Sequence, residues 1–189
     1  WRVCRSIFRK KEEMKPKFII FFDALVASLY STLKVVLLSK FSLPRPSKIS
    51  NQQDCVLLGN GPSLKEFLAN HLDFLQGKAV FAVNNFVRTD AFSKVKPAYY
   101  VIVAPDYWGK EEKPGFREER LKIFDELAQQ TKWKLTLFVP AVARNHQQWK
   151  NELDKNTSIS ICYFNNTPVE GLQPISHWYF RHWLGMPRP

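Results

Sequence analysis

A short apolar run that leads directly into a glycine-rich turn constrains the fold of this chain more than any other feature. Residues 54–63 read DCVLLGNGPS, in which four apolar residues precede Gly59-Asn60-Gly61-Pro62-Ser63, and a helical pattern begins at Leu64. An apolar run of this length is typical of a buried parallel strand. A strand, a glycine turn and a helix start together present backbone N–H groups to a phosphate or a carboxylate. Glycine allows close approach of the main chain, and the helix N-terminus carries a partial positive charge.

The helix after this turn carries its own start signal. We predict Ser63 as the N-cap, with Glu66 three residues later as the reciprocal capping partner. The turn is neither the GxGxxG dinucleotide fingerprint nor a P-loop, because no Gly-Lys-Ser/Thr follows. A tight strand-to-helix turn needs glycine for steric reasons as well, so the loop alone leaves ligand binding and plain turn geometry equally open.

Apolar runs alternate with helix-length spacers along the rest of the chain. Further strands are predicted over residues 78–83, 98–103, 134–139 and 158–164, and helices over residues 64–75, 116–130 and 144–153. This alternation is typical of a parallel sheet with right-handed crossovers. The sequence therefore predicts an α/β fold, namely a Rossmann-like parallel sheet with helices on both faces, preceded by an amphipathic N-terminal helix.

The first 48 residues differ from the rest of the chain in charge. They hold 11 Lys and Arg against 3 Asp and Glu, whereas the remaining residues hold 17 against 14. The net charge of +11 is therefore local, which argues against a domain-wide nucleic-acid surface and for a basic patch. Residues 39–53 read as a linker rich in Pro, Ser, Lys and Gln. We expect an N-terminal segment over residues 1–48 and one nucleotide-binding domain over residues 49–189.

Residues 18–38 read FIIFFDALVASLYSTLKVVLL and form a helix with two faces when wound at 3.6 residues per turn. The narrow polar face holds Asp23, Ala27, Ser31 and Lys34, and the apolar face holds Phe22, Leu25, Leu29, Leu33 and Val36. Three interpretations stay open. The basic flank favours attachment to an anionic membrane surface; the helix also suits packing on its own domain or on a dimer mate. A transmembrane span fits the length, but Asp23 and Lys34 make it costly.

The cysteines and the chain ends bear on the setting of the protein. Cys4, Cys55 and Cys162 have no zinc-binding or CxxC spacing, and the last two fall in strand-like apolar runs, so we expect a reducing compartment. The apolar run near the N-terminus is too long for a signal peptide and lacks a small-residue cleavage site. We therefore predict a cytoplasmic protein, peripheral at the inner membrane if the N-terminal helix attaches there. Neither Trp1 nor Pro189 resembles a natural end, so we expect a fragment of a longer chain.

Polar residues follow the predicted strands at the positions where ligands bind in open parallel sheets, just beyond the carboxyl ends. These ends carry Gly59-Asn60-Gly61, Asn84-Asn85, Pro105-Asp106, Pro140 and Asn165-Asn166. The carboxamide of asparagine has both hydrogen-bond donors and an acceptor, which suits contacts with ribose hydroxyls, base edges and phosphate oxygens. One asparagine pair alone more often ends a strand for backbone reasons. The coincidence of Asn60, Asn84 and Asn85 at neighbouring strand ends favours a polar ligand.

The remaining chemistry-bearing residues form no recognisable catalytic pattern. The Asp106 carboxylate is suited to four roles: metal ligand, hydrogen-bond acceptor for a ribose hydroxyl, general base, or helix N-cap. The scattered histidines fit no metal spacing, so we predict no metal site; they are His71, His146, His177 and His182. The aromatic stretch around His177 and His182 suits a lid, although ordinary packing is the commoner role. No Ser-His-Asp order or nucleophile elbow is present, so we assign no catalytic residue.

The run VLLGNGPSLKE, followed by VFAVNNF at residues 80–86, resembles the sialyltransferases that decorate bacterial lipooligosaccharide. Those enzymes have a very similar strand-GNGPSLKE opening and a second strand that ends in a Cys-Asn-Gln-Phe-like turn, to which Val83-Asn84-Asn85-Phe86 corresponds. The opening is also similar to the archaeal-type 6-hydroxymethylpterin pyrophosphokinase domain, found in many bacterial proteins, some of them tied to flagellin glycosylation. The resemblance covers about residues 54–108.

The sialyltransferase resemblance implies a Rossmann-like sheet that binds a CMP-sugar at these strand ends without a metal. It implies nucleotide contacts for the residues of the two turns, which are Gly59, Asn60, Gly61, Ser63, Asn84 and Asn85. Asp106 is a further nucleotide-binding candidate; the sialyltransferases have an asparagine after the third strand, so we expect donor recognition to differ. The family's catalytic histidine and tyrosines lie in motifs beyond the end of this chain.

We therefore predict a nucleotide-binding transferase, with a sialyltransferase-like glycosyltransferase of surface glycan synthesis favoured. Its donor is a nucleotide-activated sugar, CMP-sugar favoured, and its acceptor a glycan or a lipid-linked glycan. One alternative is ATP-dependent pyrophosphate transfer to a hydroxymethylpterin-like alcohol, which requires Mg²⁺ and makes the Asp106 carboxylate essential. The other is a non-catalytic nucleotide-binding module in glycan assembly. None of the three involves nucleic acid.

Overall fold

The computed structural model describes residues 16–43, 54–59, 61–104, 107–108, 116–146 and 148–187. The α-helices are α1 (Lys17–Leu38), α2 (Pro62–Asn70), α3 (Phe92–Val95), α4 (Phe116–Gln130) and α5 (Gln173–Arg181). The 3-10 helices are η1 (Leu72–Leu75), η2 (Asn84–Arg88), η4 (Ala141–Asn145), η5 (Gln148–Lys150) and η6 (Leu153–Lys155). The strands are β1 (Cys55–Leu58), β2 (Ala79–Val83), β3 (Tyr99–Val101), β4 (Leu135–Pro140), β5 (Ile159–Phe164), β6 (Pro168–Val169) and β7 (Met186–Pro187).

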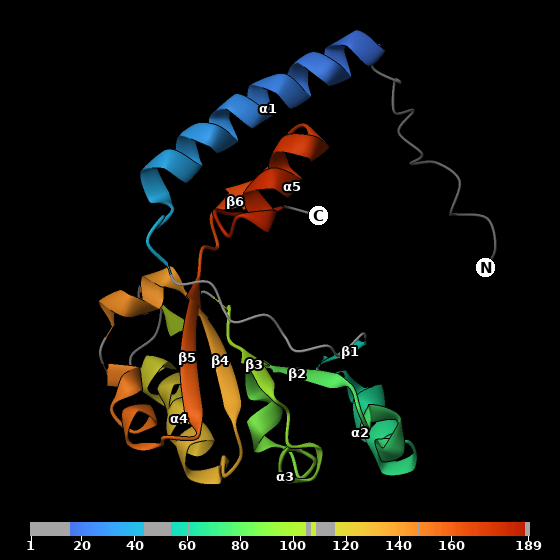
Figure 1. Ribbon diagram of the computed structural model, residues 1–189, viewed down its shortest axis with the longest axis vertical. Coiled ribbons are helices and arrows are strands. Elements are labelled where there is room, and N and C mark those ends of the chain that lie inside the picture. Colours follow the sequence, from blue (N-terminus) through green and yellow to red (C-terminus); the bar gives the residue numbers. More distant parts are fainter. Residues whose placement is uncertain are drawn as a thin grey trace, which may run out of the picture. The chain divides into compact units, whose positions relative to one another are not determined.

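The chain divides into two compact units, of which unit 2 (residues 40–166) contains the main sheet. Five parallel strands lie in the order β1-β2-β3-β4-β5, which is also their order along the chain (Figure 1). Their register places Phe81, Tyr99, Thr136 and Ser160 side by side across four strands. The predicted α/β class, the Rossmann-like parallel sheet and the N-terminal helix are confirmed.

The helices of unit 2 lie on one face of the sheet within the described residues, whereas the sequence predicted helices on both. Strand residues of that face, such as Tyr100 and Leu137, share one buried core with Leu68 of α2, Phe92 of α3 and Phe124 of α4. The strand order explains the difference. When each strand is added beside the previous one by a right-handed crossover, every connection passes over the same side.

The opposite face of the sheet carries a row of aromatic side chains. Phe81 stacks on Tyr99 with 4.5 Å between ring centroids, and Phe138 lies 6.2 Å from Tyr99. At the edge of the sheet on this face, Leu57 of β1 is 67% exposed. This face therefore gains its stability from cross-strand aromatic pairs rather than from covering helices.

The connections match the predicted helices only in part, since the helix predicted over residues 64–75 is divided into α2 and η1. Helix α4 has the predicted bounds, but the helix predicted over residues 144–153 is replaced by the short 3-10 turns η4, η5 and η6. A buried Trp149 explains this break, since its indole N–H donates to the Ala143 carbonyl at 2.9 Å. This bond holds the indole against η4. In a continuous helix, the Ala143 carbonyl would instead accept a hydrogen bond from the amide four residues later.

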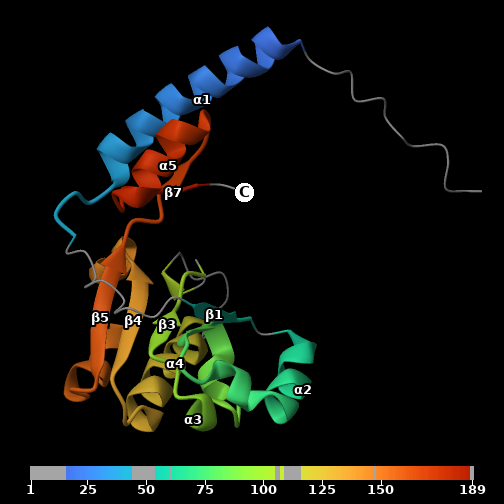
Figure 2. The same ribbon diagram turned by 45° about the vertical axis from the view of Figure 1, so that its right-hand side comes forward.

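Unit 1 combines α1 with the C-terminal segment, so residues 167–187 do not belong to the sheet domain as the sequence predicted. The Ser28 hydroxyl accepts a hydrogen bond from the Leu172 amide at 2.8 Å. The Ser31 hydroxyl accepts from the Glu170 amide at 2.8 Å and donates to the Glu170 carbonyl at 3.1 Å. Figures 1 and 2 both show α5 running beside α1. Two serines on one face of α1 thus provide hydrogen-bond partners for the backbone of residues 170–172, just after β6.

Gly171 allows this close contact. Its φ of +105° lies in a region that other residues avoid, and a Cβ there would lie 2.6 Å from the Ala24 carbonyl oxygen and closer still to Ser28. A side chain at this position therefore meets both backbone strain and a clash with α1.

We expect Gly171→Ala to destabilise the contact between α1 and residues 170–172 by about 3 kcal/mol, since left-handed strain and overpacking each cost about 1–2 kcal/mol. Hydrogen exchange of the Glu170 and Leu172 amides measures this contact. The matched control is Gly77→Ala, because Gly77 also has a positive φ of +70° but a Cβ added there would meet no atom within 4 Å. Equal protection of both amides in wild type and Gly171→Ala would contradict the close packing.

Candidate functional site

The first part of the candidate site is the turn between β1 and α2. Gly61, with φ −76° and ψ 154°, is the N-cap of α2, Pro62 occupies the first helical turn, and no side-chain cap hydrogen bond is present. The predicted cap by Ser63 is therefore wrong, because Ser63 lies inside the helix. Pro62 explains the shift, since proline favours the first helical position, where no amide hydrogen is needed. Asn60 lies outside the described residues.

The two glycines of this turn have no structural requirement that the described protein atoms explain. Neither Gly59 nor Gly61 has a positive φ. A Cβ at Gly59 would meet nothing within 4 Å, and a Cβ at Gly61 would meet only the Ser63 Oγ at 3.8 Å. The main chain is therefore bare on the side where a side chain would stand, at the start of a helix. A ligand could approach the backbone here as closely as the glycines permit.

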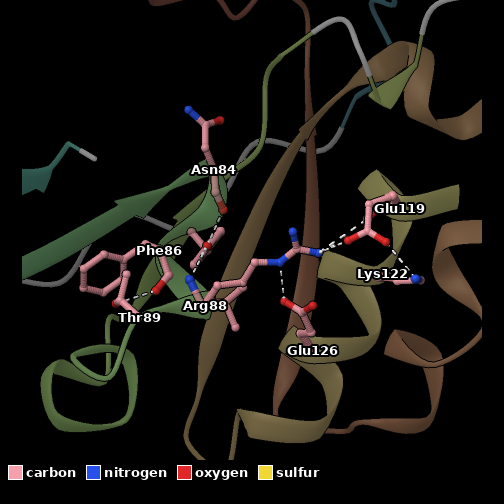
Figure 3. Close-up of polar contacts among 9 residues, drawn as sticks. Asn84, Phe86, Arg88, Thr89, Glu119, Lys122 and Glu126 are labelled. Carbon is pink, nitrogen blue, oxygen red and sulfur yellow. Dashed lines mark hydrogen bonds and ion pairs between the residues drawn. The ribbon is translucent and has the colours of Figure 1, made fainter. Parts of the chain in front are cut away.

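The second part is the turn after β2, which is held in a strained conformation. Asn84 has φ +50°, the left-handed region in which asparagine is among the few tolerated side chains. The buried Tyr100 hydroxyl donates to the Asn84 carbonyl at 2.5 Å and accepts from the Val87 amide at 2.9 Å. Figure 3 shows the Asn84 carboxamide pointing away from this bonded backbone. Tyr100 thus fixes the turn and leaves the Asn84 side chain to face outward, while Asn85 beside it is exposed.

An ion-pair network secures the far end of the same turn. Arg88 in η2 donates from Nε to Glu126 at 2.8 Å, and its terminal nitrogen lies 3.7 Å from the Glu119 carboxylate (Figure 3). The pKa of Arg88 is raised, first by the hydrogen bond to Glu126 and further by the charges of both glutamates. The network ties η2 to α4. Because its groups are partly exposed to solvent, it contributes only modestly to the free energy of unfolding.

Tyr100 and Arg88 were not predicted, although they shape the site. Tyr100 lies in an apolar strand pattern, and its hydroxyl partners are 13 and 16 residues away along the chain. A tyrosine in the middle of a buried strand is itself a signal, because its hydroxyl must find a partner. The partner residues follow only from the fold.

Asn165, at the end of β5, is not part of this site. The Asn165 side chain is used structurally, since its amide nitrogen donates to the Lys40 carbonyl at 3.0 Å and its oxygen accepts from the Lys40 amide at 2.8 Å. Asp106 lies outside the described residues, and so does its predicted nucleotide contact. Among the described residues, no group of three or more His, Cys, Asp or Glu side chains could hold a metal ion.

A shallow cavity of about 380 Å³ lies at the amino ends of β4 and β5, opposite to the candidate site. Its wall includes Asn156, whose side-chain nitrogen donates to the Ala128 and Thr131 carbonyls at 2.7 and 2.9 Å. The Asn156 oxygen accepts from the Ser158 amide at 2.9 Å. This asparagine closes the loop into β5, which accounts for its position without a ligand.

The strand order limits how a ligand is bound. In doubly wound sheets the binding crevice opens where the strand order reverses, and the five described strands contain no such reversal. The turns after β1 and β2 must therefore provide the site themselves. These strands pair directly, with Leu58 beside Ala82, so both turns leave the same edge of the sheet. In comparisons with known proteins, no protein-family model, curated protein or solved structure matches the chain.

Replacing the Tyr100 hydroxyl tests the role of this buried bridge. We expect Tyr100→Phe to lower the free energy of unfolding by about 2 kcal/mol, because it leaves the Asn84 carbonyl and the Val87 amide without their partner. Urea unfolding measures the change. Tyr99→Phe on the other face of the sheet is the control and should change stability by about 0.5 kcal/mol or less. An equal effect of the two substitutions would contradict the bridge.

The same hydroxyl predicts a loss of stability in alkali. Burial raises the pKa of Tyr100 above its usual range, so the folded chain keeps this proton where the unfolded chain releases it. The contribution of this hydroxyl to the free energy of unfolding is complete below about pH 10, the ordinary tyrosine pKa. It is lost as the pH rises toward and through the pKa of Tyr100 in the folded chain. The stability difference between wild type and Tyr100→Phe should therefore stay constant up to about pH 9 and shrink as the pH rises above about 10. A difference that stays constant above about pH 10 would contradict this assignment.

Proposed function

We propose that the chain is a nucleotide-binding transferase that holds the nucleotide of an activated sugar at the carboxyl ends of β1 and β2. The observation that supports this most is the bare main chain at Gly59 and Gly61, where an added Cβ would clash with no described protein atom. A nucleotide phosphate suits this place because it is anionic and can bind the amides of a helix N-terminus directly. The position of Asn84 at the adjacent strand end supplies a neutral carboxamide for ribose or base.

The chemistry of sugar transfer fits this arrangement. An acceptor hydroxyl attacks the anomeric carbon and releases its proton to the solvent, and the bond from that carbon to the phosphate oxygen breaks with its electron pair on the nucleotide. The α2 N-terminus would stabilise the charge of the departing phosphate. A surface glycan or a lipid-linked glycan is the proposed acceptor. No catalytic base is assigned among the described residues.

The glycine turn allows a direct test, because a substitution there can weaken nucleotide binding without lowering the stability of the fold. Gly59→Ala should leave stability unchanged or slightly raised, since the added methyl group meets no described protein atom. It should weaken nucleotide binding at least about tenfold, since that methyl group occupies the approach path of the phosphate. Thermal-shift titration of the chain with CMP, UDP, GDP and ATP, each with and without Mg²⁺, measures both effects.

Asn84→Gly is the second variant, because glycine keeps the positive φ and removes only the carboxamide. We expect a loss of nucleotide affinity of about tenfold, equivalent to one or two hydrogen bonds. Lys96→Gly is its matched control, since Lys96 has nearly the same φ of +49° at the C-cap of α3. If Gly59→Ala and Asn84→Gly both show the same nucleotide-induced thermal shift as wild type, the proposed site is wrong. A response to ATP that requires Mg²⁺ would favour pyrophosphate transfer instead.

A further inference from the structure

The outward face of α1 is apolar along its whole length. Phe18 near its start is 77% exposed and Leu37 near its end is 70% exposed. Exposed apolar side chains occur on every turn between them, and they are Ile19, Ile20, Phe21, Phe22, Leu25, Val26, Leu29, Tyr30, Leu33 and Val36. Within the described residues, α1 is long and apolar enough to cross a membrane by length and composition.

The face of the same helix that holds Ser28, Ser31 and Val35 is already occupied. Only Ser28, Ser31 and Val35 of α1 are buried, and they face the segment of residues 167–184. The two serines bond to the backbone of that segment, and the Tyr179 hydroxyl donates to the Thr32 hydroxyl at 2.8 Å. The side of α1 that holds Ser28 and Ser31 is thus packed inside, and the broad apolar side is left exposed, whereas a helix on a soluble protein usually buries its apolar side.

We infer that α1 attaches the chain to an anionic lipid membrane, lying in the plane of the interface with its apolar face among the acyl chains. At 3.6 residues per turn, the exposed apolar residues named above, other than Ile20 and Phe21, cover an arc of about 140°, wider than the seam that one partner helix fills. Lys34 lies at the edge of this arc, with its amine 4.8 Å from the centre of the Tyr30 ring. A lysine at that edge can cover apolar surface with its stem and keep its charge at the headgroups.

The charge next to the helix selects the kind of membrane. Residues 1–17 hold seven Lys and Arg against two Glu, directly before the apolar face begins at Phe18. A basic segment at the interface gains about 1 kcal/mol per Lys or Arg near an anionic surface. Burial of the apolar face among the lipids supplies a second, independent contribution to the free energy of membrane binding.

The packed side of α1 distinguishes attachment in the plane from a transmembrane span. The segment bonded to Ser28 and Ser31, near the middle of the helix, includes Glu170 and leads into α5. Helix α5 has exposed Gln173, His177 and Arg181. A span would carry these polar groups into the hydrocarbon core at a large cost. In the plane, the same groups stay on the aqueous side of the helix.

Flotation of the 189-residue chain with lipid vesicles tests the attachment. We expect flotation with vesicles of phosphatidylcholine and phosphatidylserine, and a bound fraction at least about tenfold lower with phosphatidylcholine alone. Leu29→Glu with Leu33→Glu should abolish flotation, because both side chains are exposed on the apolar face. Leu57→Glu with Leu72→Glu adds the same charge at exposed leucines of unit 2 and should float like wild type.

Unchanged hydrogen exchange at the Leu172 amide serves as the folding control for each variant. The inference is overturned if wild type does not float with anionic vesicles, or if the Leu29 and Leu33 variant floats like wild type. It is also overturned if both paired variants lose flotation equally. A chain that sediments as a stable dimer and does not float would assign the apolar face to a second copy.

Depth measurements test the in-plane orientation. Phe22→Cys, Leu29→Cys and Val36→Cys are made separately in a chain with Cys4, Cys55 and Cys162 replaced by serine, and labelled with a fluorophore. Quenching by spin-labelled lipids should place all three labels at one depth. Depths that change by about 10 Å from each position to the next, seven residues apart, would show a span and overturn the in-plane arrangement.

Discussion

The strand order of the sheet is the constraint on which the rest of unit 2 depends. Because β1 to β5 lie in the order in which they occur in the chain, right-handed crossovers place the described helices on one face. The other face stabilises itself through aromatic pairs such as Phe81 with Tyr99. The same order provides no reversal crevice, so the turns after β1 and β2 carry the candidate site, and the buried Tyr100 hydroxyl fixes the second of these turns.

Local patterns predicted the elements of this fold well. Apolar runs located all five strands of the sheet to within two residues, and the charged spacer of α4 gave its bounds. The predicted Ser63 cap is wrong because Pro62, one residue earlier, is the stronger signal for the first helical position. The packing of residues 167–187 on α1 was not predictable, since it depends on serines more than 130 residues away along the chain. The candidate turns were found from sequence, but the Tyr100 bridge behind them depends on the sheet register.

The two units follow opposite rules for placing polar and apolar residues. Unit 2 buries a large apolar core between its helices and one sheet face. Unit 1 buries only a small apolar core around Val35 and Val169, and joins α1 to the C-terminal segment through hydroxyl-to-backbone hydrogen bonds. A membrane-attached unit 1 would bring the proposed sugar transferase to an acceptor that is itself carried on lipid.

The central claim is that two neighbouring strand-end turns bind a nucleotide through their backbone and one carboxamide. Amide NMR of the isotope-labelled chain, titrated with cytidine monophosphate, tests it most directly. We expect the largest chemical-shift changes at the amides of Gly59, Gly61, Asn84 and Asn85, and we expect these changes to saturate together. Changes centred on residues 128–132 and 152–158, around the cavity at the other end of the sheet, would contradict it. So would a spectrum that stays unchanged with this and every other common mononucleotide.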